Sequence, residues 1–320
     1  MAKAIVADKN EQIDSAYHSL VKHIDSPLPI VMVSWAESFQ FNPQLLSIKD
    51  YILICYCEYG YDWDLLKSGT HIWGKNSEKF PRYYTGDWVK FDDWVKENPP
   101  KIVFKRELLQ RDKTERLLPI DYTTDLEPIP VQTEAEFNSR PVSACYYFGR
   151  SHESRLRLHA SIWEGATKHG YSVCDNPFQV WGVPEMGLGR FLDNEGGKKY
   201  ISMHLPHWFR LPIRNILQIN ALAKIGIVPF GAGQKTFRAA EASQVSIPLM
   251  WHDELAWGAD WVNGFNCFKC EPGEEVEMIE ELTKPENDLY PVYLEAVRTW
   301  EQYRTENYLN NYLLPIINNV

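Results

Sequence analysis

The chain has 320 residues, a net charge of −10 and an isoelectric point near 5.4. At roughly 100–200 residues per domain, this length predicts two domains or one large one. The hydrophobic content of 44% and the charged content of 24% exclude an intrinsically disordered chain. The excess of acidic residues argues against a protein that holds nucleic acid by bulk charge, and leaves room only for a local basic groove.

Targeting signals and disulfides are not expected. No stretch approaches the roughly 20 apolar residues that span a bilayer, and the opening MAKAIVADKNEQ is a short strand followed by charges, unlike a signal peptide. We therefore expect a cytoplasmic protein without a membrane span. Six cysteines are few for this length, and most lie in or beside apolar runs, where reduced thiols pack as small hydrophobic groups.

In the first half, short apolar runs alternate with amphipathic segments. Buried strands separated by helices are typical of an α/β fold with a parallel sheet. Residues 118–141 carry four prolines among acids and threonines, which indicates the connection between two domains. The pattern predicts strands at 4–7, 29–35, 50–57 and 101–104, and helices at 13–23 and 88–97.

After the connection the alternation starts again. The pattern predicts strands at 142–148, 171–174, 200–203, 225–229 and 247–250, and helices at 151–169, 213–224 and 235–243. We therefore expect an N-terminal Rossmann-like domain over 1–138 and a C-terminal one over 139–320. Two such domains would face a cleft, and open parallel sheets bind ligands beyond the carboxyl ends of their strands.

The segment from Ile225 to Trp251 is the most informative. A strand runs into Gly231 and Gly233, and the predicted helix that follows places Lys235, Arg238 and Glu241 on one face. The glycines would let a ligand approach the backbone, a helix start favours a phosphate, and a carboxylate can accept hydrogen bonds from a ribose. An ordinary i,i+3 ion pair between Arg238 and Glu241 on a surface helix explains the spacing equally well.

This segment also carries a resemblance. The run FRAAEA, followed by SIPLMWHDELAW and WVNGFNCFKCEPGE, resembles the group 1-like donor-binding domain of GT-B glycosyltransferases, over about residues 200–275. The resemblance implies that Glu241 binds the ribose of a nucleotide and that Lys235 and Arg238 bind its diphosphate. One departure is Gly233, which stands where many members have a first glutamate; the Gln234–Lys235 pair instead resembles the Glu-Lys pair of some fucosyltransferase-like branches.

A second match lies at the start of the C-terminal half. The run RPVSACYYFGR, followed by Arg155 and Arg157, resembles the strand, turn and helix with which the donor domain of these enzymes begins. The resemblance implies that Arg150 in the turn faces the diphosphate. An arginine that simply faces solvent is the alternative, and the position of Arg150 after a strand favours the anion site.

Catalysis would need a carboxylate in the first domain. Transfer with inversion removes a proton from the acceptor hydroxyl, so we looked for acids directly after predicted strands. Glu58 follows the stronger buried strand and is our first candidate, with Asp62 and Asp64 close behind, and Glu37 is the second. Such acids also commonly cap loops and helices, which is the alternative explanation for each of them.

The remaining patterns favour structural roles. His204 and His207 lack an identifiable third ligand, and Cys267-x-x-Cys270 has no second pair at metal spacing, so no metal site is expected. Trp251, Trp257 and Trp261 could shape a pocket or belong to the core. The apolar spacing over 291–312 predicts a last helix, which the resemblance would carry back onto the first domain and which core packing explains just as well.

Together these patterns predict a glycosyltransferase that moves a hexose or pentose from a nucleotide-diphosphate sugar to an unidentified hydroxyl acceptor. Fixed positive charge would stabilise the leaving diphosphate, so no metal or other cofactor is expected. The acceptor could be a glycan or DNA with a modified base. DNA would require a basic groove, for which the dense candidates are Lys101, Lys105, Arg106 and Arg111. The alternative is a non-catalytic nucleotide- or sugar-binding protein on the same scaffold.

Overall fold

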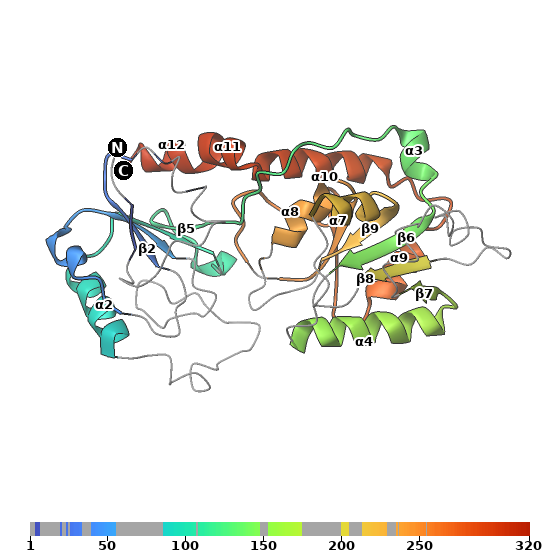
Figure 1. The fold of residues 1–320 in the computed structure, drawn as a ribbon, viewed down its shortest axis with the longest axis horizontal. Helices are drawn as coiled ribbons and strands as arrows, with labels where there is room; N and C mark the ends of the chain where they lie inside the picture. Colours follow the sequence, from blue (N-terminus) through green and yellow to red (C-terminus); the bar gives the residue numbers. More distant parts are fainter. Residues whose placement is uncertain are drawn as a thin grey trace.

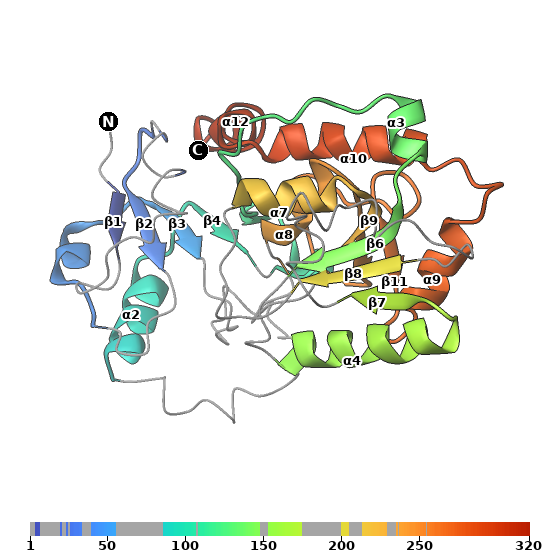
Figure 2. The same ribbon diagram turned by 45° about the vertical axis from the view of Figure 1, so that its right-hand side comes forward.

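Two parallel sheets, one from each half of the chain, organise the molecule (Figures 1 and 2). A computed structural model describes residues 4–6, 20, 24, 26–33, 40–55, 86–106, 108–147, 153–174, 200–204, 213–228, 235, 237–253 and 255–320. The predicted helix at 13–23 lies outside these residues except for position 20. Among the described residues, no helix is long and apolar enough to cross a membrane.

The N-terminal sheet has five strands whose order in space follows their order in the chain. They are β1 (Ala4–Val6), β2 (Ile30–Val33), β3 (Ile52–Cys55), β4 (Ile102–Lys105) and β5 (Leu117–Pro119), and every neighbouring pair is parallel. The first four fall within or beside the predicted ranges. β5 was not predicted: Leu118 and Pro119, assigned to the connection from sequence, pair with Phe104 and Lys105 instead.

Alternate side chains of these strands enter two different apolar clusters, because successive residues in a strand point to opposite faces. In β3, Leu53 packs in one cluster with Phe91 and Trp94 of α2 (Gly86–Glu97). Ile52 and its equivalents in neighbouring strands pack in the other cluster, which contains residues from the end of the chain. The sheet is therefore covered on both faces, by α2 on one face and on the other by a cluster that includes residues from the end of the chain.

The C-terminal sheet has six strands in the order β11-β10-β9-β6-β8-β7, all parallel. These strands are β6 (Val142–Tyr147), β7 (Ser172–Cys174), β8 (Tyr200–His204), β9 (Ala223–Ile227), β10 (Ile247–Trp251) and β11 (Phe268–Cys270). On one side lie α4 (Glu153–Lys168) and α9 (Glu275–Leu282); on the other lie α7 (Ile213–Asn220), α8 (Phe237–Ser243) and α10 (Tyr290–Tyr303) (Figures 1 and 2).

Two predicted boundaries in this half were wrong. The helix predicted over 213–224 ends at Asn220, because the backbone beyond it joins the sheet: Val142 donates its N–H to the Leu222 carbonyl, and Arg140 donates to the Ala223 carbonyl at 2.6 Å. The helix predicted over 235–243 begins at Phe237, so Lys235 precedes it.

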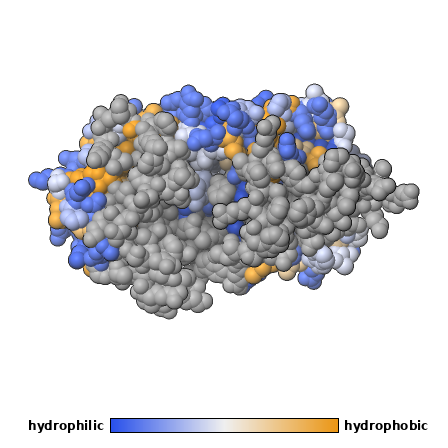
Figure 3. All heavy atoms as spheres, viewed as in Figure 1, coloured by the Kyte–Doolittle hydropathy of each residue, from blue (hydrophilic) through white to orange (hydrophobic). Residues whose placement is uncertain are grey.

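The end of the chain runs along the N-terminal sheet (Figure 1). We call residues 304–320 the C-terminal tail; it contains α11 (Thr305–Tyr308), the π-helical turn Leu309–Leu313 and α12 (Leu314–Ile317). The single helix predicted over 291–312 is interrupted at Arg304, whose extended backbone lets Thr305 donate to the Thr124 carbonyl. Buried residues of the tail, Tyr308, Leu309, Leu313 and Ile317, share a cluster with Ile30, Ile52 and Ile102. The outer edge above α10 to α12 is mainly hydrophilic (Figure 3).

The connection between the sheets is partly ordered by its own contacts. It contains α3 (Glu134–Asn138), where Thr133 accepts a bond from the Glu136 N–H and the Glu136 carboxylate accepts from the Thr133 N–H. Phe137 of this helix stacks on Tyr293 of α10 at a centroid distance of 4.7 Å. The segment is therefore held against the C-terminal half along its length.

Candidate functional site

The strand order of the C-terminal sheet creates a natural ligand position. β6 and β9 are neighbours, yet the helices that follow them, α4 and α8, cover opposite faces of the sheet (Figure 1). The chain thus diverges at the carboxyl ends of these two strands, and ligands of open α/β sheets bind at such points. The residues that α4 and α8 place there are consequently the candidates for a site.

Two guanidinium groups meet at this point. Arg155 lies in the first turn of α4 and Arg238 in the first turn of α8. Burial and the positive charge of Arg238 both lower the pKa of Arg155, so the two cations are close enough to repel each other. Arginine keeps its charge under such conditions, and a pair of arginines held together attracts an anion that can bind both.

A buried carboxylate accompanies them. Glu241 lies one turn after Arg238 on α8 and forms an ion pair with it, in the i,i+3 arrangement that the sequence allowed. Only 9% of Glu241 is exposed, and burial raises its pKa although the Arg238 guanidinium opposes the shift. Arg238 donates to Oε2 of this carboxylate.

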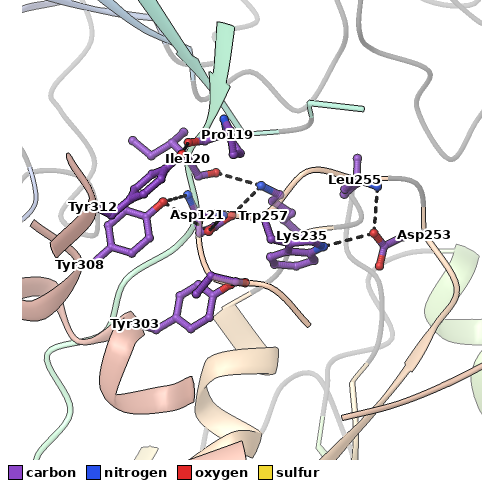
Figure 4. Close-up of polar contacts among 12 residues, drawn as sticks. Pro119, Ile120, Asp121, Lys235, Asp253, Leu255, Trp257, Tyr303, Tyr308 and Tyr312 are labelled. Atoms are coloured by element: carbon purple, nitrogen blue, oxygen red, sulfur yellow. Dashed lines mark hydrogen bonds and ion pairs between the residues drawn. The ribbon is translucent and has the colours of Figure 1, made fainter. Parts of the chain in front are cut away.

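Lys235 does not share this face. Its ammonium turns to the connection between the sheets, where it lies 2.6 Å from Oδ1 of Asp121 and 3.3 Å from the Ile120 carbonyl (Figure 4). It also lies 4.8 Å from the centre of the Trp257 ring. Both charged side chains are 0% exposed. The expectation that Lys235, Arg238 and Glu241 line one helical face was therefore wrong, because a buried acid from another segment holds the lysine.

Asp121 is bonded on both oxygens. Oδ2 accepts from the Gly258 N–H at 2.6 Å and from the Tyr308 hydroxyl at 3.3 Å, and the same hydroxyl accepts from the Asp121 N–H at 3.0 Å (Figure 4). Position 258 requires glycine, because a Cβ atom there would lie 2.6 Å from the Tyr308 hydroxyl oxygen and 2.8 Å from Oδ2. We call these residues, Asp121, Lys235, Trp257, Gly258 and Tyr308, the junction cluster.

Asp121 is the residue that sequence reasoning missed. It follows a strand by two residues, which is the position examined for chemistry elsewhere in the chain. The four prolines of residues 118–141 are typical of a connection and hide this position. A buried apolar pair before it, Pro119 and Ile120, was the available signal.

Several other expectations fall outside the described residues. Glu37, Glu58, Arg150, Gly231 and Gly233 all lie there, and their proposed roles stay predictions. The same holds for His207, and nothing is described of the His204 side chain. Within the part of the chain that is described, no group of three His, Cys, Asp or Glu side chains is arranged to hold a metal.

The three tryptophans and the two cysteines considered above as functional candidates are part of the core. Trp251, Trp257 and Trp261 are at most 8% exposed, and Trp251 donates to Glu275 of α9 at 2.5 Å. Cys267 and Cys270 are free, buried thiols, and burial raises the pKa of each to about 12. Such thiols are neutral and unreactive, which fits the packing role expected for them.

The basic groove needed for a DNA acceptor is not formed by the residues named for it. Lys105 and Arg106 are each 1% exposed, so neither presents its charge to a duplex. Lys101 and Arg111 are exposed, and Lys101 pairs with Asp50 at 2.9 Å, so two of the four candidates lie at the surface. The described N-terminal residues thus give no support to DNA as acceptor.

Comparison with known proteins identifies the fold. No protein-family model and no curated protein matches the sequence. The structure is similar to that of Alr3699/HepE from Anabaena in complex with UDP, with a TM-score of 0.53 and 10% identity over 99% of this chain and 100% of that one. The structure of the same protein with UDP and glucose gives 0.51 and 11%, over 100% of both chains. The chain therefore has the α/β, two-Rossmann-domain fold of the GT-B glycosyltransferases.

Proposed function

We propose that the protein is a glycosyltransferase that uses a nucleotide-diphosphate sugar as donor. The observation that carries this proposal is the placement of Arg155 on α4, and of the Arg238–Glu241 ion pair on α8, the two helices that follow the diverging strands β6 and β9. The HepE structures of the same fold were solved with UDP and with UDP and glucose, so UDP sugars are the first donors to test.

The chemistry of the three side chains suits such a donor. Arg155 and Arg238 would bind the two phosphates and stabilise the negative charge that grows on the diphosphate as the sugar leaves. Oε1 of Glu241 would accept hydrogen bonds from the ribose hydroxyls. Arg150, Gly231 and Gly233 would complete the phosphate contacts. Lys235 is left out of the donor contacts, because Asp121 holds its ammonium.

The acceptor side of the reaction rests on sequence predictions. Glu58, or failing that Glu37, would take the proton of the acceptor hydroxyl as the new bond forms. Fixed arginines would make a metal unnecessary for the leaving group. Asp62 and Asp64 have Asp-x-Asp spacing, however, so every assay should be run with EDTA and with Mn²⁺.

Calorimetric titration with UDP, GDP, ADP, CDP and TDP tests the donor site. We expect one diphosphate to bind selectively, and Glu241→Ala to weaken it at least about tenfold, equivalent to about 1.4 kcal/mol. The native chain should prefer this nucleotide to its 2′-deoxy form. A smaller preference in Glu241→Ala would locate the lost contact at the ribose. Glu295→Ala is the matched control, because Glu295 forms a similar i,i+3 pair with Arg298 on α10.

Release of the diphosphate from its sugar nucleotide tests the transfer. We expect slow release by hydrolysis, a faster rate with glycan acceptors, and a larger loss of rate than of affinity in Arg238→Ala. Saturable binding without any release, with every acceptor and with or without Mn²⁺, would favour a nucleotide-binding protein. Failure of all five diphosphates to bind would contradict the proposal.

A further inference from the structure

The junction cluster brings together four segments that are distant in sequence. Ile120 and Asp121 come from the connection after β5, Lys235 from the residues before α8, Gly258 from the loop after β10 and Tyr308 from α11. Figure 4 shows the Lys235 ammonium and the Tyr308 hydroxyl directed toward Asp121. The pair at its centre is separated by 114 residues.

A buried ion pair needs an explanation other than stability. Removing two charges from water is costly, and well-packed apolar residues of similar volume often stabilise a protein as well or better. What the pair supplies is a fixed distance and direction, since both oxygens of Asp121 and the ammonium of Lys235 have partners in defined geometry. Lys235 is therefore held at one place relative to the connection and the C-terminal tail.

Lys235 lies close in sequence to the proposed donor site. Lys235 stands three residues before Arg238 and six before Glu241, the two groups of α8 proposed to bind phosphate and ribose. A shift at Lys235 would move the first turn of α8 relative to Arg155 on α4. Because charge-assisted contacts to a diphosphate depend on distance and direction, a small displacement would weaken them.

We propose that Asp121 is a positioning residue for the donor site: through Lys235 it fixes the first turn of α8 so that Arg238 and Glu241 face Arg155. This inference rests on the proposed donor site. On this proposal the connection and the tail influence nucleotide affinity through Lys235, without either of them contacting the nucleotide. The competing explanation is that Lys235 itself contacts phosphate and that Asp121 merely screens it.

The two explanations predict different changes in nucleotide affinity for Asp121→Asn. If Asp121 positions α8, this variant weakens binding of the best diphosphate found for the native chain about tenfold or more. If Lys235 binds phosphate directly, removing the competing carboxylate leaves affinity unchanged or raises it. The double variant Asp121→Asn/Lys235→Met removes both charges together, so it should melt near the native temperature and keep the loss of affinity.

A matched pair of tyrosine variants separates positioning from general packing. Tyr308→Phe removes a hydroxyl that donates to Asp121, and we expect about a threefold to fivefold loss of affinity. Tyr312→Phe removes a hydroxyl that donates to the Pro119 carbonyl at 2.7 Å, beside the cluster but not on Asp121, and should stay within twofold of native. If Asp121→Asn does not fold, this pair and the double variant decide.

The results distinguish the two proposals. A native chain that binds none of the diphosphates overturns the proposed function and this inference with it. A native chain that binds, together with a well-folded double variant and Tyr308→Phe of native affinity, overturns the inference alone. Loss of affinity in Asp121→Asn and in Tyr308→Phe at native melting temperature supports it, because both variants keep Lys235. A gain of affinity in Asp121→Asn favours direct contact of Lys235 with phosphate and overturns it.

Discussion

The two sheets are built from the same kind of strand but in different orders. In the N-terminal sheet the strands follow one another from β1 to β5, so the described chain never reverses its direction across the sheet. In the C-terminal sheet the order reverses at β6, and α4 and α8 leave neighbouring strands on opposite faces. The reversal gives the C-terminal sheet an internal position for a ligand, which the described strand order of the N-terminal sheet does not provide.

The same difference decides how each sheet is covered. The C-terminal sheet is flanked on both sides by helices from its own half (Figures 1 and 2). The N-terminal sheet has α2 on one face, and residues of the C-terminal tail pack in the cluster on its other face together with Leu20 and Ile24 of its own half. We call this contribution of the tail the borrowed layer, and the junction cluster lies where it passes.

The largest expected effect comes from removing the borrowed layer. Deleting residues 305–320 removes Leu309, Leu313 and Ile317 from the core, and each such loss costs about 2–5 kcal/mol. The sum is comparable to the whole stability of a domain, about 5–15 kcal/mol. We expect limited proteolysis to cut the shortened chain within residues 1–119 while the C-terminal sheet resists.

Deletion of the exposed residues 318–320 is the control for this truncation. It should leave the cleavage pattern and the melting temperature as in the native chain. Equal protection of both halves in the chain that ends at Arg304 would show that the tail is not the missing layer.

A smaller effect probes the cover that the C-terminal sheet supplies for itself. Gly165 of α4 packs against α9, and a Cβ atom there would lie 2.8 Å from Cβ of Val276. Overpacking costs about 1–3 kcal/mol and exceeds the gain of about 1 kcal/mol from replacing a helical glycine with alanine. We expect Gly165→Ala to lower the free energy of unfolding in urea by about 1 kcal/mol.

The sign of this change should depend on the neighbour. In a Val276→Gly background both clashing atoms of this side chain, Cβ and Cγ2, are absent, so Gly165→Ala should then be neutral or stabilising by up to about 1 kcal/mol. If Gly165→Ala is equally destabilising in both backgrounds, contact between α4 and α9 is not its cause.

The smallest effect concerns the ligand position itself and depends on pH. Burial raises the pKa of Glu241 above its usual value of 4.5. A ribose hydroxyl donates best to the ionised carboxylate, so donor affinity should be full at neutral pH and fall as pH drops through the raised pKa, earlier than for an exposed glutamate. Calorimetry with a UDP sugar is the measurement, because its phosphates stay ionised throughout this range.

Glu241→Gln provides the comparison for the pH series. The variant has no carboxyl group to protonate, so its weaker binding should not change between about pH 5 and pH 8. An identical acid limb in the variant and the native chain would assign the titration to another group.

Much of the fold follows from local pattern. Runs such as those of β3 and β10 are short, apolar and bounded by polar residues, and they form the buried strands that this pattern predicts. The range of α4 was also close to the prediction. The predictions were wrong where contacts between distant residues determine the local structure. The helix predicted over 291–312 breaks at Arg304, because the Thr124 carbonyl accepts a hydrogen bond from the Thr305 N–H.

The candidate site shows the same division. The sequence predicts that Arg238 and Glu241 share one face of a helix. That spacing is explained equally well by a donor site and by a plain ion pair. Lys235 could not be placed from sequence, because its partner Asp121 lies 114 residues away and belongs to a segment that appeared to be only a connection. Pairing over such distances depends on how two sheets pack, which no local pattern contains.

The borrowed layer also has a consequence for biosynthesis. Tyr312 bonds to Pro119 across 193 residues, so contacts that complete the N-terminal sheet form only after nearly all of the chain has been made. On a ribosome the first half would emerge before the tail residues that pack on one apolar face of its sheet, and contacts of such long range form slowly. Nascent chains of this protein should therefore depend on a chaperone until the tail is released.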